Sequence, residues 1–200
     1  KRVNRSKDGE GPERNEKSVE NSKDSTPYRT RIYAHYLSGK SPHFRDRAGR
    51  DRGGLDSTHR SVIRWLPVNK NAAILDCGCG RGDFLESLRS SGYLNPSGVD
   101  VSPAAVADAK QRDLDVSLGV ATQYLRARVH DLEVVTAFDL VEHLMKDELV
   151  EFLDACHGAL RPGGTLIIRT PNGDSPFGAA LRYSDFTHEI MLTPRSVTWL

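Results

Sequence analysis

The stretch that decides the fold is "ILDCGCGRGDFL", Ile74 to Leu85, in which an apolar run leads directly into a turn with three glycines. The run "AAILDCG" predicts a buried strand, and "GDFLESLRSSG" predicts a helix that ends at Gly92. Glycines at such a turn let the backbone approach a bound molecule closely. The stretch therefore predicts a strand, a ligand-binding turn and a helix in succession.

Strand and helix patterns continue to alternate along the chain. Four more apolar stretches predict strands, namely "PSGVDVS", "LDVSLGV", "LEVVTAFDL" and "TLIIRT". Three stretches between them predict helices: "SPAAVADAKQR", with Ser102 as cap and Pro103 at its first position, "ATQYLRAR", and "KDELVEFLDACHGAL", which "RPGG" stops. Parallel strands need such crossovers. The chain is therefore predicted to be an α/β domain with a doubly wound, mainly parallel sheet.

Three kinds of ligand compete for the glycine turn. Cys77 and Cys79 lack a second ligand pair at a workable spacing, which argues against zinc. A dinucleotide fingerprint needs its third glycine at the position of Asp83, and a P-loop needs a Gly-Lys-Ser/Thr sequence that does not follow. What remains is an Asp-x-Gly-x-Gly-x-Gly motif, carried by Asp76, Gly78, Gly80 and Gly82.

This motif resembles that of the class I S-adenosylmethionine-dependent methyltransferases, in which an acid at the strand end faces the ammonium group of the cofactor. Asp100 follows Gly78 by 22 residues, where a doubly wound sheet places the carboxylate that binds ribose hydroxyls. "VVTAFDLVEHL" is similar to the family's fourth strand and loop, and "LRPGGTLIIRTPN" to its fifth strand. The resemblance covers residues 72–200 and implies S-adenosylmethionine as cofactor.

The resemblance also implies a set of cofactor-binding residues around the turn and the neighbouring strand ends: Asp76, Gly78, Cys79, Gly80, Gly82, Asp100, Val101, Ala121 and Phe138. The chain departs from the family after its third strand, where Gly119-Val120-Ala121 stands in place of the frequent Gly-Asp pair. The adenine is then expected to meet backbone groups and apolar contacts, unless the third strand lies elsewhere.

The acceptor side is expected in the segment from Thr170 to Val197, because loops of this length in compact domains are usually functional. Its Pro-Asn, Ser-Pro-Phe and Asp-Phe-Thr-His-Glu series resembles a bacterial subgroup often tied to methylation of cell-surface glycans or other small molecules. The resemblance implies a small-molecule acceptor, methylated on an oxygen of a saccharide or related metabolite. An alcohol benefits from a base, and His188 is the first catalytic candidate and His143 the second. The alternative for each of these two histidines is a structural role as a buried side chain.

Asp139, Glu142 and His143 are spaced i, i+3, i+4 and would share a face on one helical turn. A similar acid-x-x-Glu-His cluster binds a divalent ion in ubiquinone-pathway O-methyltransferases, and a further histidine after the fifth strand joins it in small-RNA 2′-O-methyltransferases. The resemblance implies a metal site for Mg²⁺ or Mn²⁺ made of Asp139, Glu142, His143 and His188. A hydrogen-bonded pocket wall without metal is the alternative.

Composition narrows the remaining choices. The chain has 200 residues, 38% of them hydrophobic, and a formal net charge of +1, which favours one globular domain and gives no general attraction for nucleic acid. A small-molecule acceptor is therefore favoured over nucleic acid as partner. No apolar run suits a membrane span or a signal peptide, so a cytoplasmic protein without membrane contact is expected. The oligomeric state stays open.

The expected boundaries follow composition and family pattern. Residues 1–26 are predicted to be a disordered charged tail, residues 27–71 a helical flank or lid, and residues 72–200 the methyltransferase domain. The class I sheet usually ends in a hairpin of two further strands, for which this sequence has no residues, so we expect a truncated domain whose fifth strand is an edge. Two other functions stay open: a metal-dependent RNA 2′-O-methyltransferase and a non-catalytic cofactor-binding partner module.

Overall fold

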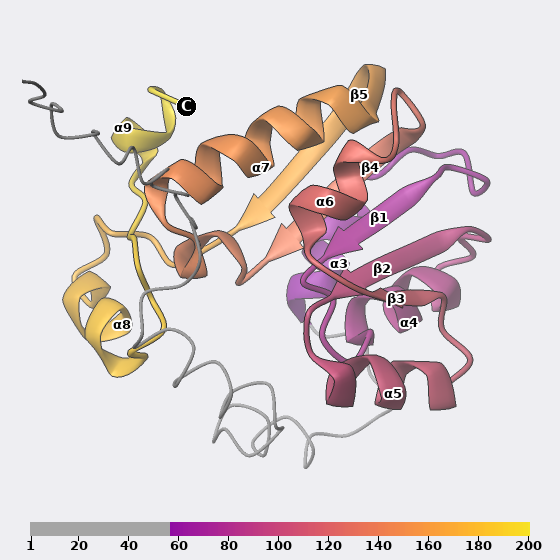
Figure 1. Ribbon diagram of the computed structural model, residues 1–200, viewed down its shortest axis with the longest axis horizontal. Coiled ribbons are helices and arrows are strands. Elements are labelled where there is room, and N and C mark those ends of the chain that lie inside the picture. Colours follow the sequence, from indigo (N-terminus) through magenta and orange to yellow (C-terminus); the bar gives the residue numbers. More distant parts are fainter. Residues whose placement is uncertain (1–56) are drawn as a thin grey trace, which may run out of the picture.

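A sheet of five parallel strands forms the centre of the domain (Figure 1). The computed structural model describes residues 57–200. The strand order is β3-β2-β1-β4-β5, which confirms the predicted doubly wound α/β fold. The strands are β1 (Ile74–Cys77), β2 (Pro96–Asp100), β3 (Val116–Leu118), β4 (Leu132–Phe138) and β5 (Leu160–Arg169). The predicted tail, residues 1–26, and the first part of the predicted flank, residues 27–56, lie outside the described residues.

Helices cover both faces of the sheet, as parallel strands require. One face carries α3 (Ser57–Ile63), α4 (Asp83–Ser90) and α5 (Pro103–Gln111). The other face carries α6 (Ala121–Arg126) and α7 (Lys146–Ala159). The helices predicted from the repeated strand-helix pattern are therefore confirmed.

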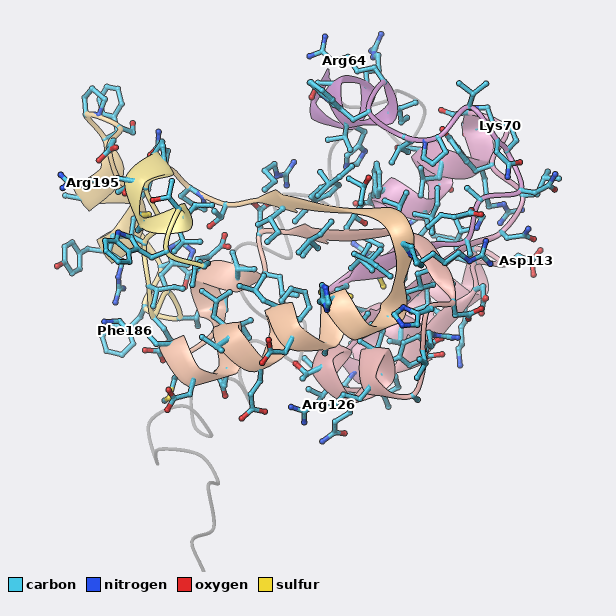
Figure 2. The ribbon with its side chains drawn as sticks, turned by 90° about the horizontal axis from the view of Figure 1, so that it is seen from above. Arg64, Lys70, Asp113, Arg126, Phe186 and Arg195 are labelled. Atoms are coloured by element: carbon cyan, nitrogen blue, oxygen red, sulfur yellow. The ribbon has the colours of Figure 1, made fainter. Side chains whose placement is uncertain are left out.

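Two separate hydrophobic cores hold these layers together. Successive strand residues point to opposite faces, so Ile74 lies in the core beneath α4, whereas Leu75 lies in the core with Phe152 of α7. All four residues of β1 are buried, which explains why its sequence is apolar except for Asp76. Arg64, just after α3, and Arg126 of α6 mark opposite sides of the layers in Figure 2.

Within the predicted flank, the sequence "STHRSVIRWL", residues 57–66, predicts a helix that ends before Pro67, and the observed helix α3 is shorter. It ends at Ile63, and the backbone N–H of Leu66 donates to the Ile63 carbonyl at 3.2 Å in a turn. Pro67 disfavours helical backbone in the residue that precedes it, which accounts for the early end.

The fifth strand begins earlier than expected. "RPGG" was predicted to stop the preceding helix ahead of the strand, but β5 starts at Leu160, directly after α7, and includes these four residues. Leu160 pairs with Leu132 of β4, and the register then shifts before Thr165 pairs with Val134. The Pro-Gly-Gly sequence thus forms an irregularity within the strand. Among the described residues β5 pairs with β4 alone in the sheet, as predicted for an edge.

The segment after β5 lies beyond the carboxyl ends of the strands (Figure 1). It contains α8 (Gly178–Ser184) and α9 (Pro194–Val197). An isolated bridge between Asn172 and Leu192 joins its two ends. Ligands of open α/β sheets bind at this edge, so the segment closes over the expected site.

Within the part of the chain that the structure describes, no helix has the length and apolar character needed to cross a membrane.

Candidate functional site

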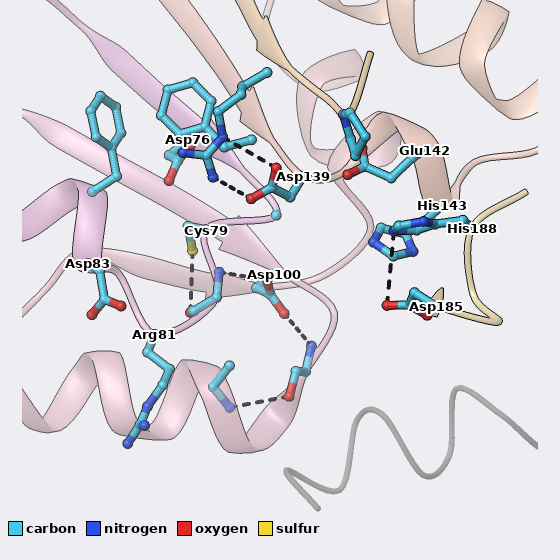
Figure 3. Close-up of a pocket in the computed structure, with 18 of the residues that line it drawn as sticks. Asp76, Cys79, Arg81, Asp83, Asp100, Asp139, Glu142, His143, Asp185 and His188 are labelled. Carbon is cyan, nitrogen blue, oxygen red and sulfur yellow. Dashed lines mark hydrogen bonds and ion pairs between the residues drawn. The ribbon is translucent and has the colours of Figure 1, made fainter. Parts of the chain in front are cut away.

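A cavity of about 350 Å³ opens at the carboxyl ends of the strands (Figure 3). Its walls come from the glycine turn, the ends of β2, β4 and β5, and the segment that contains α8. In Figure 3, Asp76, Asp100 and Asp139 lie on one side, whereas His143 and His188 lie on the other. The cavity therefore joins an acid-lined half to a histidine-lined half.

The glycine turn has a backbone that only glycine adopts easily. Gly78, Gly80 and Gly82 have φ values of +69°, +55° and +81°. A Cβ atom added to Gly80 would meet nothing within 4 Å, and Gly80 lines the cavity. The N–H of Gly78 donates to the Val99 carbonyl at 2.8 Å, which fixes the turn to β2. The turn thus places backbone atoms without a side chain at the edge of the cavity.

Asp100 ends β2 and braces this turn. Its carboxylate accepts hydrogen bonds from the backbone N–H groups of Gly80 and Ser102, both at 2.8 Å. Burial raises the pKa of Asp100, and the two N–H groups oppose this effect. A carboxylate has about four acceptor sites, so two bonded N–H groups leave capacity for ligand hydroxyls.

Asp76 lies deeper, on β1. It is 3% exposed and accepts a hydrogen bond of 2.7 Å from the Thr136 hydroxyl. Burial raises the pKa of Asp76 to about 7. A buried carboxylate at a cavity wall favours a cationic ligand group, because a nearby positive charge offsets the cost of burying the negative one.

Other residues predicted to bind the cofactor are divided between the cavity and its surroundings. Cys79 and Phe138 line the cavity. Gly82, Val101 and Ala121 are not among its lining residues. A Cβ atom at Gly82 would lie 2.4 Å from the Leu114 side chain, so this glycine is needed for packing.

The helical turn predicted to join Asp139 to Glu142 and His143 is wrong. A 3₁₀ helix begins only at Val141, and Asp139 has a left-handed φ of +51°. The Asp139 carboxylate forms an ion pair with Arg169, whose Nε donates to Oδ1 at 3.3 Å. The Asp139 carboxylate is therefore paired with Arg169, and Asp139 is not among the residues whose ligand atoms the structure brings together.

Glu142, His143 and His188 do come together. Each offers one ligand atom, and these atoms lie within 4.8 Å of one another. Burial raises the pKa of Glu142 to about 7, and its carboxylate accepts a hydrogen bond of 3.0 Å from Thr170. Burial lowers the pKa of His143, and the nearby His188 lowers it further. Two imidazoles and a carboxylate suit either proton transfer or a divalent ion.

Sequence reasoning missed several residues of the cavity. Arg169 ends an apolar strand, and a charge at the carboxyl end of a strand was the available signal. Asp185 stands two residues before Thr187, a spacing that allows a side chain to bond its own turn. His59 of α3 also lines the cavity, and nothing in its sequence context indicates a role in binding or catalysis.

Comparison with known proteins agrees with this geometry. Residues 74–164 match the family model described as a methyltransferase domain. The ubiquinone biosynthesis O-methyltransferase of Pseudomonas syringae pv. tomato is 30% identical over 121 residues, which cover 55% of this chain and 50% of the relative. The small RNA 2′-O-methyltransferase of Arabidopsis thaliana is 31% identical over 126 residues, 56% of this chain and 13% of the relative. The chain spans about half the length of the ubiquinone relatives it matches.

Solved structures share the fold. A SAM-dependent methyltransferase from Archaeoglobus fulgidus has a TM-score of 0.65 at 24% identity, and the match covers 85% of this chain and 71% of that one. The magnesium protoporphyrin IX methyltransferase of Synechocystis, solved with bound SAM, has a TM-score of 0.54 at 19% identity, covering 68% and 73%. The family match over residues 74–164, the glycine turn and the strand order agree, and this part of the chain is therefore similar to methyltransferase domains and shares the fold of S-adenosylmethionine-dependent methyltransferases of known structure.

Proposed function

We propose that this protein transfers a methyl group from S-adenosylmethionine to an oxygen of a small-molecule acceptor. The observation that carries the proposal is a single cavity with the glycine turn, Asp76 and Asp100 on one side and the histidine pair on the other. Such a cavity can hold a cofactor and an acceptor next to each other, and alignment of reacting groups supplies much of the rate of a displacement.

The acid-lined half fits S-adenosylmethionine. Asp76 offers a buried carboxylate to its ammonium group, and Asp100 offers its remaining acceptor sites to the ribose hydroxyls. Gly80 leaves room for the ligand beside the backbone. At the adenine end, Val120 stands directly before α6 in place of an acid, and the adenine is proposed to meet apolar and backbone groups instead. When bound, the cofactor supplies a sulfonium methyl group.

The histidine-lined half fits activation of an alcohol. His188 is the proposed base, since its Nδ1 faces the Leu181 carbonyl oxygen at 2.9 Å and its Nε2 is left unprotonated. A proton taken from the acceptor hydroxyl would sit on Nε2, 4.0 Å from the Asp185 carboxylate. His143 is the second candidate, because its lowered pKa keeps the ring neutral at physiological pH.

The acceptor is proposed to be a saccharide or a related hydroxylated metabolite. Support for an oxygen comes from the two relatives, whose names describe O-methyl transfer. Support for a small molecule comes from the cavity of about 350 Å³ and from the long segment that lines it. A cytoplasmic location stays a prediction.

A metal-dependent RNA 2′-O-methyltransferase is the second candidate function. It is favoured by the cluster of Glu142, His143 and His188, whose ligand atoms lie within 4.8 Å of one another. These three residues would hold Mg²⁺ or Mn²⁺, and the ion would supply charge stabilisation at the acceptor oxygen. Asp139 stays a predicted fourth ligand, although the structure pairs it with Arg169.

Methyl-labelled S-adenosylmethionine distinguishes these functions. The protein is incubated with a saccharide pool, a pool of other hydroxylated metabolites, or RNA with and without its terminal 2′-hydroxyl, and labelled products are identified by mass spectrometry. We expect label in a small molecule, lost in His188→Gln and kept in His157→Gln, a matched change at an exposed position of α7. Label in RNA alone would favour the second function. Cofactor binding without transfer to any pool would favour a non-catalytic module.

A further inference from the structure

The segment after β5 sets the protonation pattern of both histidines. The Nδ1 atom of His188 lies 2.9 Å from the Leu181 carbonyl oxygen. A carbonyl oxygen only accepts hydrogen bonds, so Nδ1 of the neutral ring carries the proton. The lone pair of His188 is therefore on Nε2.

Thr187 imposes the same pattern on His143. The Nδ1 atom of His143 lies 2.9 Å from the Thr187 hydroxyl oxygen and 3.2 Å from the Thr187 carbonyl oxygen. The hydroxyl proton is committed elsewhere, because Thr187 donates to Oδ1 of Asp185 at 2.6 Å. An ionised carboxylate has no proton to return, so the hydroxyl accepts from His143. Asp185 thus determines the direction of the whole chain of hydrogen bonds.

This chain of hydrogen bonds is locally braced. The backbone N–H of Thr187 donates to the same Asp185 oxygen at 2.8 Å, which closes a turn of the type that aspartate favours. Thr187 is 7% exposed, so water competes little for its hydroxyl. The hydrogen bonds that link Asp185, Thr187 and His143 are therefore in place before any ligand binds.

We propose that Asp185 and Thr187 are positioning residues that hold His143 with its proton on Nδ1 and its lone pair on Nε2. The role rests on the proposed function, since His143 needs an unprotonated Nε2 to take a proton or to bind an ion. A free imidazole side chain in water prefers the opposite tautomer. The fold must therefore impose this one, and a direct measurement can detect it.

The tautomer is measured by two-bond proton–nitrogen NMR correlation on the ¹⁵N-labelled protein at about pH 8, where a histidine of ordinary pKa is neutral. We expect both His143 and His188 to carry the proton on Nδ1. A His143 ring with its proton on Nε2 in the unaltered protein overturns the proposal without any variant.

Variants test the two positioning residues separately. Asp185→Ala and Thr187→Val are expected to increase the fraction of His143 with its proton on Nε2, and Thr187→Ser to restore the original signal. Thr170→Val is the matched control, because its hydroxyl lies in the same cluster but donates to Glu142. A Thr187→Val spectrum identical to that of the Thr170→Val protein would assign the tautomer to the Thr187 carbonyl alone and overturn the role of its hydroxyl.

Kinetics separate this inference from the proposed function. Asp185→Ala and Thr187→Val should lower kcat for methyl transfer by about 10-fold or more with little change in the KM for cofactor, and Thr187→Ser should recover it. If the protein shows both histidines protonated on Nδ1 but transfers no methyl group, the proposed function is contradicted and the tautomer assignment still holds. Full activity with the His143 proton on Nε2 would overturn the positioning role alone.

Discussion

The backbone N–H of Gly80 donates a hydrogen bond of 2.8 Å to the Asp100 carboxylate, which ties the glycine turn after β1 to the end of β2. The bond fixes the carboxylate before a ligand arrives. A group held in place loses less freedom on binding, which increases affinity. The turn and the strand end therefore act as one preformed half of the cofactor site.

Removal of the Asp100 carboxylate should weaken cofactor binding severely. Asp100→Ala removes a pair of charge-assisted hydrogen bonds to the ribose hydroxyls, and each contributes about 1.5–3 kcal/mol. The Kd for S-adenosylmethionine should therefore rise at least about 100-fold. Calorimetry measures the change. Asp115→Ala, at an exposed position before β3, is the matched control and should keep normal affinity. Equal affinity in the two variants would remove the ribose assignment.

A side chain at Gly80 should block the cofactor. Gly80→Val and Gly92→Val place the same side chain at left-handed backbone positions where an added Cβ meets nothing within 4 Å. Both should lose comparable stability in thermal unfolding, by roughly 1–2 kcal/mol for the backbone alone. Only Gly80 lines the cavity, so only Gly80→Val should abolish cofactor binding. Normal methyl transfer by this variant would place the pocket elsewhere.

Cofactor affinity should rise with pH through neutrality. Burial raises the pKa of Asp76 to about 7, so the carboxyl group is neutral below this pH and charged above it. Only the charged form attracts the cofactor ammonium group, and the Kd should therefore fall between about pH 6 and pH 8. Asp76→Asn should bind weakly with a flat pH profile. Glu142→Gln, which removes the other carboxyl group with a pKa of about 7, should keep the slope.

Binding of a divalent ion should depend on the carboxylate of Glu142. Titration with Mn²⁺, followed by calorimetry or electron paramagnetic resonance, should show binding that Glu142→Gln weakens at least about 10-fold. Glu151→Gln, a matched change in the exposed Arg126–Glu151 pair of α6 and α7, should bind as the unaltered protein does. Undiminished methyl transfer in the presence of EDTA, with no metal found by elemental analysis, would contradict a role for a divalent ion.

The fold could be predicted from the sequence because its signals are local. A mostly apolar run marks a strand covered on both faces, as in β1, where Asp76 is the one charged residue. Ser102 caps α5 as its sequence indicates, since its hydroxyl accepts from the Ala105 N–H at 3.3 Å. The start of β5 was missed because its first pair, Leu132 with Leu160, depends on a partner far along the chain.

The details of the site depend on long-range contacts that spacing does not reveal. The ion pair of Asp139 with Arg169 follows from the β4–β5 register, which sets Phe138 opposite Arg169. The i, i+3, i+4 spacing assumed a helical turn at Asp139, but its left-handed backbone turns that side chain toward β5 instead. His143 meets Thr187 across 44 residues, so only the fold brings them together.

A crystal structure of the complex with S-adenosylhomocysteine tests the central claim most directly. We expect the ribose hydroxyls on the Asp100 carboxylate, the amino group at Asp76, and the thioether sulfur on the side of the cavity that faces His143 and His188. A ligand bound away from the glycine turn, or one whose sulfur faces away from the two histidines, would contradict it.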